Sequence, residues 1–122
     1  MYGETSFEEY FQKILKKYND KGISISYFQS NVEGEIISKL HETGFAHNGI
    51  ILNAGAYTHT SIAIADAVAG IQTPVIEVHI TNIFAREDFR HVSYLGKHCK
   101  GSISGFGLKG YEMAIDALTI ES

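Results

Sequence analysis

The sequence of 122 residues contains one cysteine (Cys99), one proline (Pro74) and no tryptophan. A single cysteine excludes an internal disulfide and a metal site built from several cysteines. No apolar run approaches the ~20 residues that a membrane-spanning helix needs, and residues 1–5 have neither the basic region nor the apolar core of a signal peptide. These absences predict a cytoplasmic protein with no membrane partner.

Basic residues are also scarce, since 10 Lys and Arg against 14 Asp and Glu give a net charge of −4. This balance disfavours nucleic acid as a partner, because such binding needs a basic face. A small anionic substrate held by local donors is still compatible with it. Hydrophobic residues make up 44% of the chain and charged residues 20%, as in ordinary globular proteins. The length predicts one domain over residues 1–122.

Apolar residues recur with helical spacing in several parts of the chain. The clearest stripe consists of Phe7, Tyr10, Phe11, Ile14, Leu15 and Tyr18, which share one face of a helix that ends near Gly22. Shorter patterns predict further helices at about 32–44, 61–70, 82–89 and 108–119.

Stretches rich in β-forming residues lie between these helices, at 23–28, 49–53, 74–80 and 102–104. Strands that alternate with helices predict an α/β fold, a doubly wound parallel sheet covered on both faces. Ligands bind beyond the carboxyl ends of the strands in such folds. The segments that follow the predicted strands, and are therefore the places to look for a site, are 29–31, 53–59, 79–82 and 105–110.

The segment Glu77-Val78-His79 ends a predicted buried strand. Strand alternation puts Glu77 and His79 on the same face. A buried carboxylate beside a histidine can fix the tautomer of the ring and raise its pKa, which suits a general acid. A purely structural pair is the alternative. A metal is less expected, because only His59 offers a third ligand and no tight ligand spacing is present.

Residues 53–61 read Asn-Ala-Gly-Ala-Tyr-Thr-His-Thr-Ser and connect a predicted strand to a predicted helix. The loop supplies the amide of Asn53, the imidazole of His59, several hydroxyls and the N–H groups of a helix start, which together suit an anion or a polyol. Ordinary loop and capping chemistry is the alternative. Arg86 and Arg90 are four residues apart, so they share a helix face, either in a site or on an ion-paired surface.

Residues 105–110 read Gly-Phe-Gly-Leu-Lys-Gly and match the G-x-G-x-x-G pattern. We do not interpret them as a dinucleotide site. That site needs a following strand and an acidic residue about 20 positions on, and the sequence ends at Ser122. The nucleophile elbow of hydrolases and the phosphate-binding loop are absent as well.

Five blocks together resemble the signature blocks of type II 3-dehydroquinate dehydratases, in the order of that family and over nearly the whole chain. They are QSNVEGEI (29–36), ILNAGAYTHTS (51–61), VIEVHITN (75–82), ARE (85–87) and GFGLKGY (105–111). The resemblance implies a flavodoxin-like fold and a carbon–oxygen lyase of the shikimate pathway, a dehydratase that removes water from 3-dehydroquinate by anti elimination. It also implies no cofactor, no metal, and a homododecamer built from trimers.

The resemblance implies roles for single residues. Tyr2 would be the base that takes a proton from C2 of the substrate, and His79, oriented by Glu77, would protonate the departing hydroxyl. The residues that would contact or enclose the substrate are Asn53, His59 and Arg90 at its hydroxyls, the N–H groups of Ile80 and Thr81 at its carboxylate, Arg86 in a lid, and Asp66 reaching the site of a neighbouring subunit.

One part of the family pattern is absent. Members of the family have a first strand and a loop before the Tyr-Gly pair, and that loop supplies an Asn and an Arg to the site. Two alternatives to an active dehydratase therefore stand. One is an impaired or inactive relative that binds a cyclic polyol acid, and the other is a flavodoxin-like module that binds a flavin or a phosphate.

The order of elements points to the same absence. Doubly wound domains normally begin with a strand, whereas this chain opens on a helix and has only four predicted strands. In the flavodoxin-like order the missing strand would lie between the strands at 23–28 and 49–53. Buried unpaired backbone groups cost about 1–3 kcal/mol each. We therefore expect either another peptide in that position, or a closing of the two strands with distortion of the site around His79.

Overall fold

The computed structural model describes residues 4–82 and 93–119. Its elements, in chain order, are α1 (Glu4–Asn19), α2 (Glu33–Thr43), β1 (Ile50–Leu52), η1 (Gly55–His59), α3 (Ile62–Gly70), β2 (Val75–His79), η4 (Gly96–His98), β3 (Gly101–Ser104) and α4 (Lys109–Thr119). The strands form one parallel sheet in the order β1-β2-β3. None of the described helices is long and apolar enough to cross a membrane.

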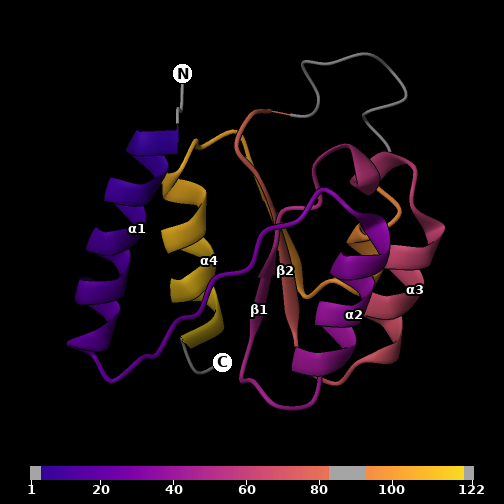
Figure 1. Ribbon diagram of the computed structural model, residues 1–122, viewed down its shortest axis with the longest axis horizontal. Coiled ribbons are helices and arrows are strands. Elements are labelled where there is room, and N and C mark those ends of the chain that lie inside the picture. The colour runs from indigo at the N-terminus through magenta and orange to yellow at the C-terminus, as the bar shows by residue number, and fades with distance from the viewer. Residues whose placement is uncertain (1–3, 83–92, 120–122) are drawn as a thin grey trace.

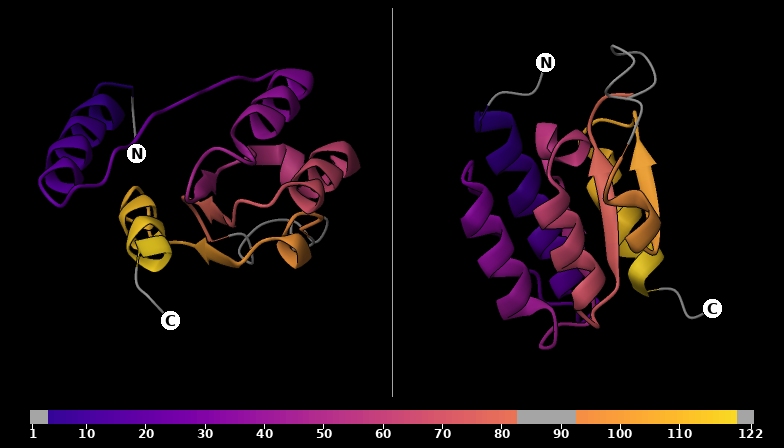
Figure 2. Two further views of the ribbon diagram at one scale, coloured as in Figure 1. Left: turned by 90° about the horizontal axis from the view of Figure 1, so that it is seen from below. Right: turned by 90° about the vertical axis from the view of Figure 1, so that its right-hand side faces the viewer.

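Different helix pairs cover the two faces of the sheet. Figure 1 and Figure 2 show α1 beside α4 on one side of the sheet and α2 beside α3 on the other. Ile51, Ile76 and Val78 face α1 and α4, whereas Leu52 and Val75 face α2 and α3. Neighbouring residues of a strand point to opposite faces, so β1 and β2 each contribute to both cores. The predicted α/β fold with helices on both faces is confirmed.

Contacts between α1 and α4 fasten the first helix to the rest of the molecule. Ile14 and Tyr18 of α1 are buried against Ile115 of α4. The hydroxyl of Tyr18 donates to Asp116 Oδ1 at 2.7 Å, which satisfies the one polar atom of an otherwise buried ring. Burial of a side chain of this size stabilises the fold by about 1.5–3 kcal/mol. The apolar stripe read from the sequence is therefore the surface that docks α1.

β2 is the central strand, and all five of its residues are buried. Its register places Glu77 between Leu52 of β1 and Ser102 of β3, and His79 beside Ser104. The predicted helices at 32–44, 61–70 and 108–119 correspond to α2, α3 and α4, and the predicted strands after residue 49 correspond to β1, β2 and β3. The predicted helix at 82–89 lies almost entirely outside the described residues.

The strand predicted at residues 23–28 is a difference between prediction and structure. These residues form no strand, and they belong to the long connection that crosses from α1 to α2 (Figure 1). Among the described residues, β1 pairs with β2 alone. Ile23 and Ile25 still pack with Ile51 against the α1–α4 cluster. The alternating pattern thus reflects one-sided burial, whereas a strand also needs a hydrogen-bonded neighbour.

We expect the backbone amides of residues 24–28 to exchange with solvent much faster than those of Val75–His79. Amides without ladder hydrogen bonds need no opening event, whereas those in the core of a sheet exchange only on larger unfolding. Hydrogen exchange followed by mass spectrometry on the native protein measures both segments at once, with the amides of α4 as a slow reference. Equally slow exchange in the two segments would contradict an unpaired connection.

Candidate active site

The parallel strands bring the predicted site residues to one edge of the sheet. Asn53 directly follows β1, His79 is the last residue of β2, and Gly105 directly follows β3. The carboxyl ends of parallel neighbours lie at the same edge, which is where doubly wound folds bind ligands. The segments that sequence analysis selected at 53–59, 79–82 and 105–110 therefore meet.

Glu77 and His79 form a buried pair on the face of β2 that points toward α3. Their relative exposures are 2% and 4%, and His79 Nε2 lies 3.1 Å from Glu77 Oε2. An ionised carboxylate can only accept a hydrogen bond, so Nε2 must carry the proton in this contact. That leaves Nδ1 as the ring nitrogen that can exchange a proton with a substrate.

The carboxylate of Glu77 has further donors besides His79. The hydroxyl of Ser102 lies 2.6 Å from Oε1, and the hydroxyl of Ser93 lies 3.2 Å from Oε1 and 3.0 Å from Oε2. Burial raises the pKa of Glu77, but the hydrogen bonds from its three partners outweigh this effect and hold the pKa below its ordinary value. The group is therefore a carboxylate at neutral pH despite its burial.

Asn53 has an exposed side chain whose orientation is fixed at both ends. Its Nδ2 donates to the hydroxyl oxygen of Tyr111 at 2.9 Å, and its Oδ1 accepts from the N–H of Gly55 at 3.1 Å. Two hydrogen bonds of this kind hold a flexible amide in one rotamer. Tyr111 of α4 is therefore part of the support of the site, although the sequence analysis assigned it no role.

His59 is buried in η1, with a relative exposure of 6%. Its ring lies near that of His79, with 6.3 Å between the ring centroids and 24° between the planes. The neighbouring Thr58 is fully buried, and its carbonyl accepts from the N–H of Tyr94 at 2.9 Å. The structure thus places the two predicted histidines side by side on one face of the sheet.

The glycine-rich segment 105–110 lies against the end of β2. The N–H of Gly105 donates to the carbonyl of His79 at 3.1 Å, and the N–H of Gly107 donates to the carbonyl of Ile80 at 2.9 Å. Both glycines have positive φ, +92° and +61°, a conformation that side-chain-bearing residues rarely adopt. These contacts account for the motif without a nucleotide, and they hold the backbone around Ile80 and Thr81, the segment predicted to bind a carboxylate.

The remaining predicted site residues are Asp66, Tyr2, Arg86 and Arg90. Asp66 is exposed on α3. Tyr2, Arg86 and Arg90 lie outside the described residues.

Within residues 4–82 and 93–119, no group of three His, Cys, Asp or Glu side chains is arranged to hold a metal ion. Cys99 lies near Glu77, and burial together with the charge of Glu77 raises the pKa of its thiol to about 12. A thiol with so high a pKa is a poor nucleophile at neutral pH.

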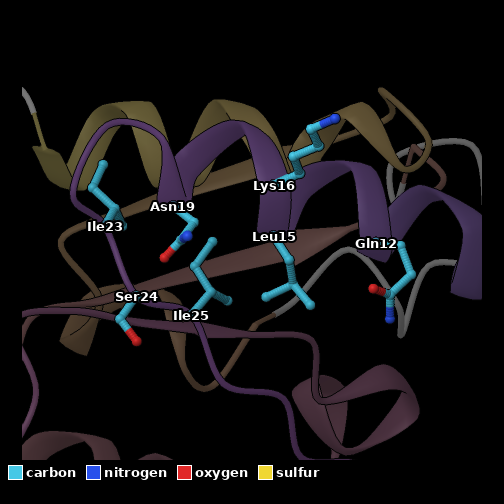
Figure 3. Close-up of a pocket in the computed structure, with 7 residues that line it drawn as sticks. All are labelled: Gln12, Leu15, Lys16, Asn19, Ile23, Ser24 and Ile25. Carbon is cyan, nitrogen blue, oxygen red and sulfur yellow. The ribbon is translucent and has the colours of Figure 1, made fainter.

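A surface groove lies apart from this site, between α1 and the connection that follows it (Figure 3). Its volume is ≈ 390 Å³, and its lining consists of Gln12, Leu15, Lys16, Asn19, Ile23, Ser24 and Ile25. None of these residues is a predicted site residue. The candidate active site is therefore the cluster around Glu77 and His79, and not this groove.

Comparison with known proteins gives one consistent result. The model of the family Dehydroquinase class II matches residues 1–119. The chain is 50% identical over 119 residues to a 3-dehydroquinate dehydratase of Caldicellulosiruptor bescii, covering 97% of this chain and 82% of that relative. The corresponding values for a 3-dehydroquinate dehydratase of Ruegeria pomeroyi are 47% identity over 118 residues, with 97% and 79% covered.

Solved structures agree with the sequence comparisons. A type II dehydroquinase from Butyrivibrio crossotus has a TM-score of 0.85 and 48% identity, with 92% of this chain and 79% of that chain covered. A type II dehydroquinase from Propionibacterium acnes has a TM-score of 0.88 and 36% identity, with 97% and 81% covered. The match to the family model, over residues 1–119, spans the described site residues.

We expect Glu77→Gln to lower the free energy of unfolding by about 1–3 kcal/mol at pH 7, because a neutral amide cannot accept from three donors as a carboxylate does. The folded-state pKa of Glu77 is depressed. The contribution of the Glu77 carboxylate to the free energy of unfolding is therefore present above the unfolded-state pKa. It is lost as the pH falls through the folded-state pKa. Urea unfolding of wild type and variant at pH 7 and at progressively acidic pH tests this. A difference in stability that does not narrow in acid would be the contrary result.

Proposed function

This chain belongs to the class II dehydroquinase family, and we propose that the Glu77–His79 pair carries out the proton transfer that completes its reaction. The enzyme is a type II 3-dehydroquinate dehydratase, a hydro-lyase of the shikimate pathway that converts 3-dehydroquinate to 3-dehydroshikimate. The observation that supports our assignment best is the contact between His79 Nε2 and the buried carboxylate of Glu77 at 3.1 Å.

The reaction removes a proton from C2 of the substrate and a hydroxyl from the adjacent position, with an enolate between the two steps. We assign the second proton transfer to His79. In the imidazolium form Nε2–H donates to Glu77, and Nδ1–H is the proton that the departing hydroxyl oxygen receives. A positioned acid of this kind contributes on the order of 10²–10⁴ in rate.

The first step needs a strong base, because the proton next to a ketone is only weakly acidic. By resemblance to the family we assign this role to the phenolate of Tyr2, which lies outside the described residues. An ordinary tyrosine has a pKa near 10, and each unit by which the site lowers that pKa requires about 1.36 kcal/mol. No metal and no cofactor enters this scheme.

The substrate is a cyclic polyol acid, so its binding needs hydroxyl partners and anion partners. We assign hydroxyl contacts to Asn53, His59 and Arg90, and carboxylate contacts to the N–H groups of Ile80 and Thr81. The fixed orientation of Asn53 and the closeness of His59 to His79 support this arrangement. Arg86 is assigned to a lid, as the resemblance implies.

We also propose that the chain assembles as trimers that form a dodecamer. The exposed face of α3 supports an interface, because Ile62 is 64% exposed and lies one turn before Asp66, which is exposed as well. In this assembly Asp66 reaches the site of a neighbouring subunit. A cytoplasmic location and a single domain over residues 1–122 stay predictions from the sequence.

We expect His79→Ala to lower kcat by about 10²–10⁴-fold and to leave the binding of 3-dehydroquinate largely unchanged, because the imidazole is assigned proton transfer and not substrate affinity. Steady-state assays near neutral pH measure the first quantity, and calorimetric titration with substrate measures the second. His41→Ala, at an exposed position of α2, is the matched control. A His79→Ala enzyme that keeps most of its kcat would remove this residue from the mechanism.

We expect the protein to be a homo-oligomer whose mass is a multiple of three chains, and Ile62→Asp to dissociate it. A carboxylate at this position would have to be desolvated in the interface, which is costly when it has no partner. Light scattering at micromolar concentration measures both masses, with Glu42→Gln on the exposed face of α2 as the control. A stable wild-type monomer, or an unaltered Ile62→Asp oligomer, would contradict the proposed interface.

A further inference from the structure

Two serine hydroxyls bind the same carboxylate that orients His79. Ser93 lies within 3.2 Å of both oxygens of Glu77, and Ser102 lies 2.6 Å from Oε1. Neither serine is adjacent to Glu77 in the sequence. Hydrogen bonds between a hydroxyl and a carboxylate are among the stronger ones in proteins, so these two contacts affect both the orientation and the ionisation of Glu77.

The hydroxyl of Ser93 is oriented by its own partner. The N–H of Gly96 donates to Ser93 Oγ at 3.0 Å, which occupies an acceptor position of that oxygen and leaves the hydroxyl proton for Glu77. The segment that carries Ser93 is itself anchored. Leu95 is fully buried, and the N–H of Tyr94 donates to the carbonyl of Thr58 at 2.9 Å.

The position of Ser102 follows from the pairing of β2 with β3. Their parallel register sets Ser102 directly beside Glu77, and both side chains point to the same face of the sheet because paired residues share an orientation. Ser102 as a residue is exposed, whereas Glu77 is buried. The hydroxyl of Ser102 therefore reaches the carboxylate from the neighbouring strand.

Gly96 lies close beside the carboxylate. A Cβ at this position would lie 3.2 Å from Glu77 Oε1 and 3.5 Å from Ser93 Oγ. The first distance is shorter than ordinary van der Waals contact, so a side chain there would press on the carboxylate. Backbone, two hydroxyls and an imidazole thus surround Glu77 and leave its oxygens little freedom.

We propose that Ser93 and Ser102 are positioning residues that hold Glu77 as an ionised carboxylate directed at Nε2 of His79. The proposal rests on the function proposed above, in which this pair delivers the proton to the departing hydroxyl. Donors to the charged form stabilise it against protonation in a buried site. The other titratable groups near Glu77 among the described residues are His79 on β2 and Cys99 after η4, with His59 of η1 next to His79.

A pair of variants that match each other in shape separates the effect of the Ser102 hydroxyl from the effect of side-chain size. Ser102→Val and Ser102→Thr have nearly the same volume and suit a strand equally well, but only threonine keeps the donor. Ser93→Ala removes the second donor, and Ser38→Ala, at an exposed position of α2, is a control for loss of a serine hydroxyl. The readouts are the carboxyl ¹³C shift of Glu77 against pH, assigned through Glu77→Gln, and the pH profile of kcat for 3-dehydroquinate.

We expect Ser93→Ala and Ser102→Val each to raise the titration midpoint of Glu77 by about one pH unit, which corresponds to a tenfold change in its ionisation constant. At acidic pH, where Glu77 is protonated in the variant but ionised in the wild type, kcat falls by up to about tenfold with little change in KM. Ser102→Thr and Ser38→Ala behave as the wild type.

The ¹³C titration needs no turnover, so it tests the serine contacts even if His79→Ala shows that the proposed function is wrong. If His79→Ala abolishes turnover but the serine variants keep the wild-type kcat at acidic pH, only the positioning role fails. An unchanged Glu77 midpoint in both Ser93→Ala and Ser102→Val, or an equal loss in Ser102→Thr and Ser102→Val, would overturn the proposal.

Discussion

The burial of the Glu77 carboxylate is the constraint on which the rest of the site depends. A charge removed from water is tolerated only where donors replace its hydration. Here the donors come from three places: His79 two residues along β2, Ser102 across the β2–β3 ladder, and Ser93 in the connection before η4. The register of the sheet and the path of that connection must therefore both be correct before the carboxylate can be buried.

The two faces of β2 carry different kinds of residues. Ile76 and Val78 point into the cluster beneath α4, whereas Glu77 and His79 point to the face of α3. The apolar face supplies the hydrophobic burial that holds β2 in the centre of the sheet. The polar face can then carry a carboxylate and an imidazole in fixed positions. Because parallel strands end at one edge, Asn53 and the glycine-rich segment reach the same place.

Much of this arrangement follows from local sequence patterns. The apolar stripe from Phe7 to Tyr18 predicts α1, and strand alternation predicts that Glu77 and His79 share a face. Residues 23–28 are an exception. Alternation of apolar and polar residues indicates that one face is buried, but it carries no information on a partner strand. Local sequence patterns cannot predict the contacts of Ser93, Ser102 and Tyr111 for a related reason. These contacts depend on strand register and on helix docking, which are tertiary properties. The resemblance to a family could assign Tyr2, Arg86 and Arg90, but not their positions.

If the buried Glu77 carboxylate fixes the tautomer of His79, ¹⁵N NMR of the imidazole detects it directly. In protein labelled at histidine, the neutral ring of His79 is identified by its loss in His79→Ala. At a pH where this ring is neutral, we expect a protonated Nε2 and an unprotonated Nδ1, with this preference reduced in Glu77→Gln. A ring protonated at Nδ1, or an even mixture of the two tautomers in the wild type, would contradict it.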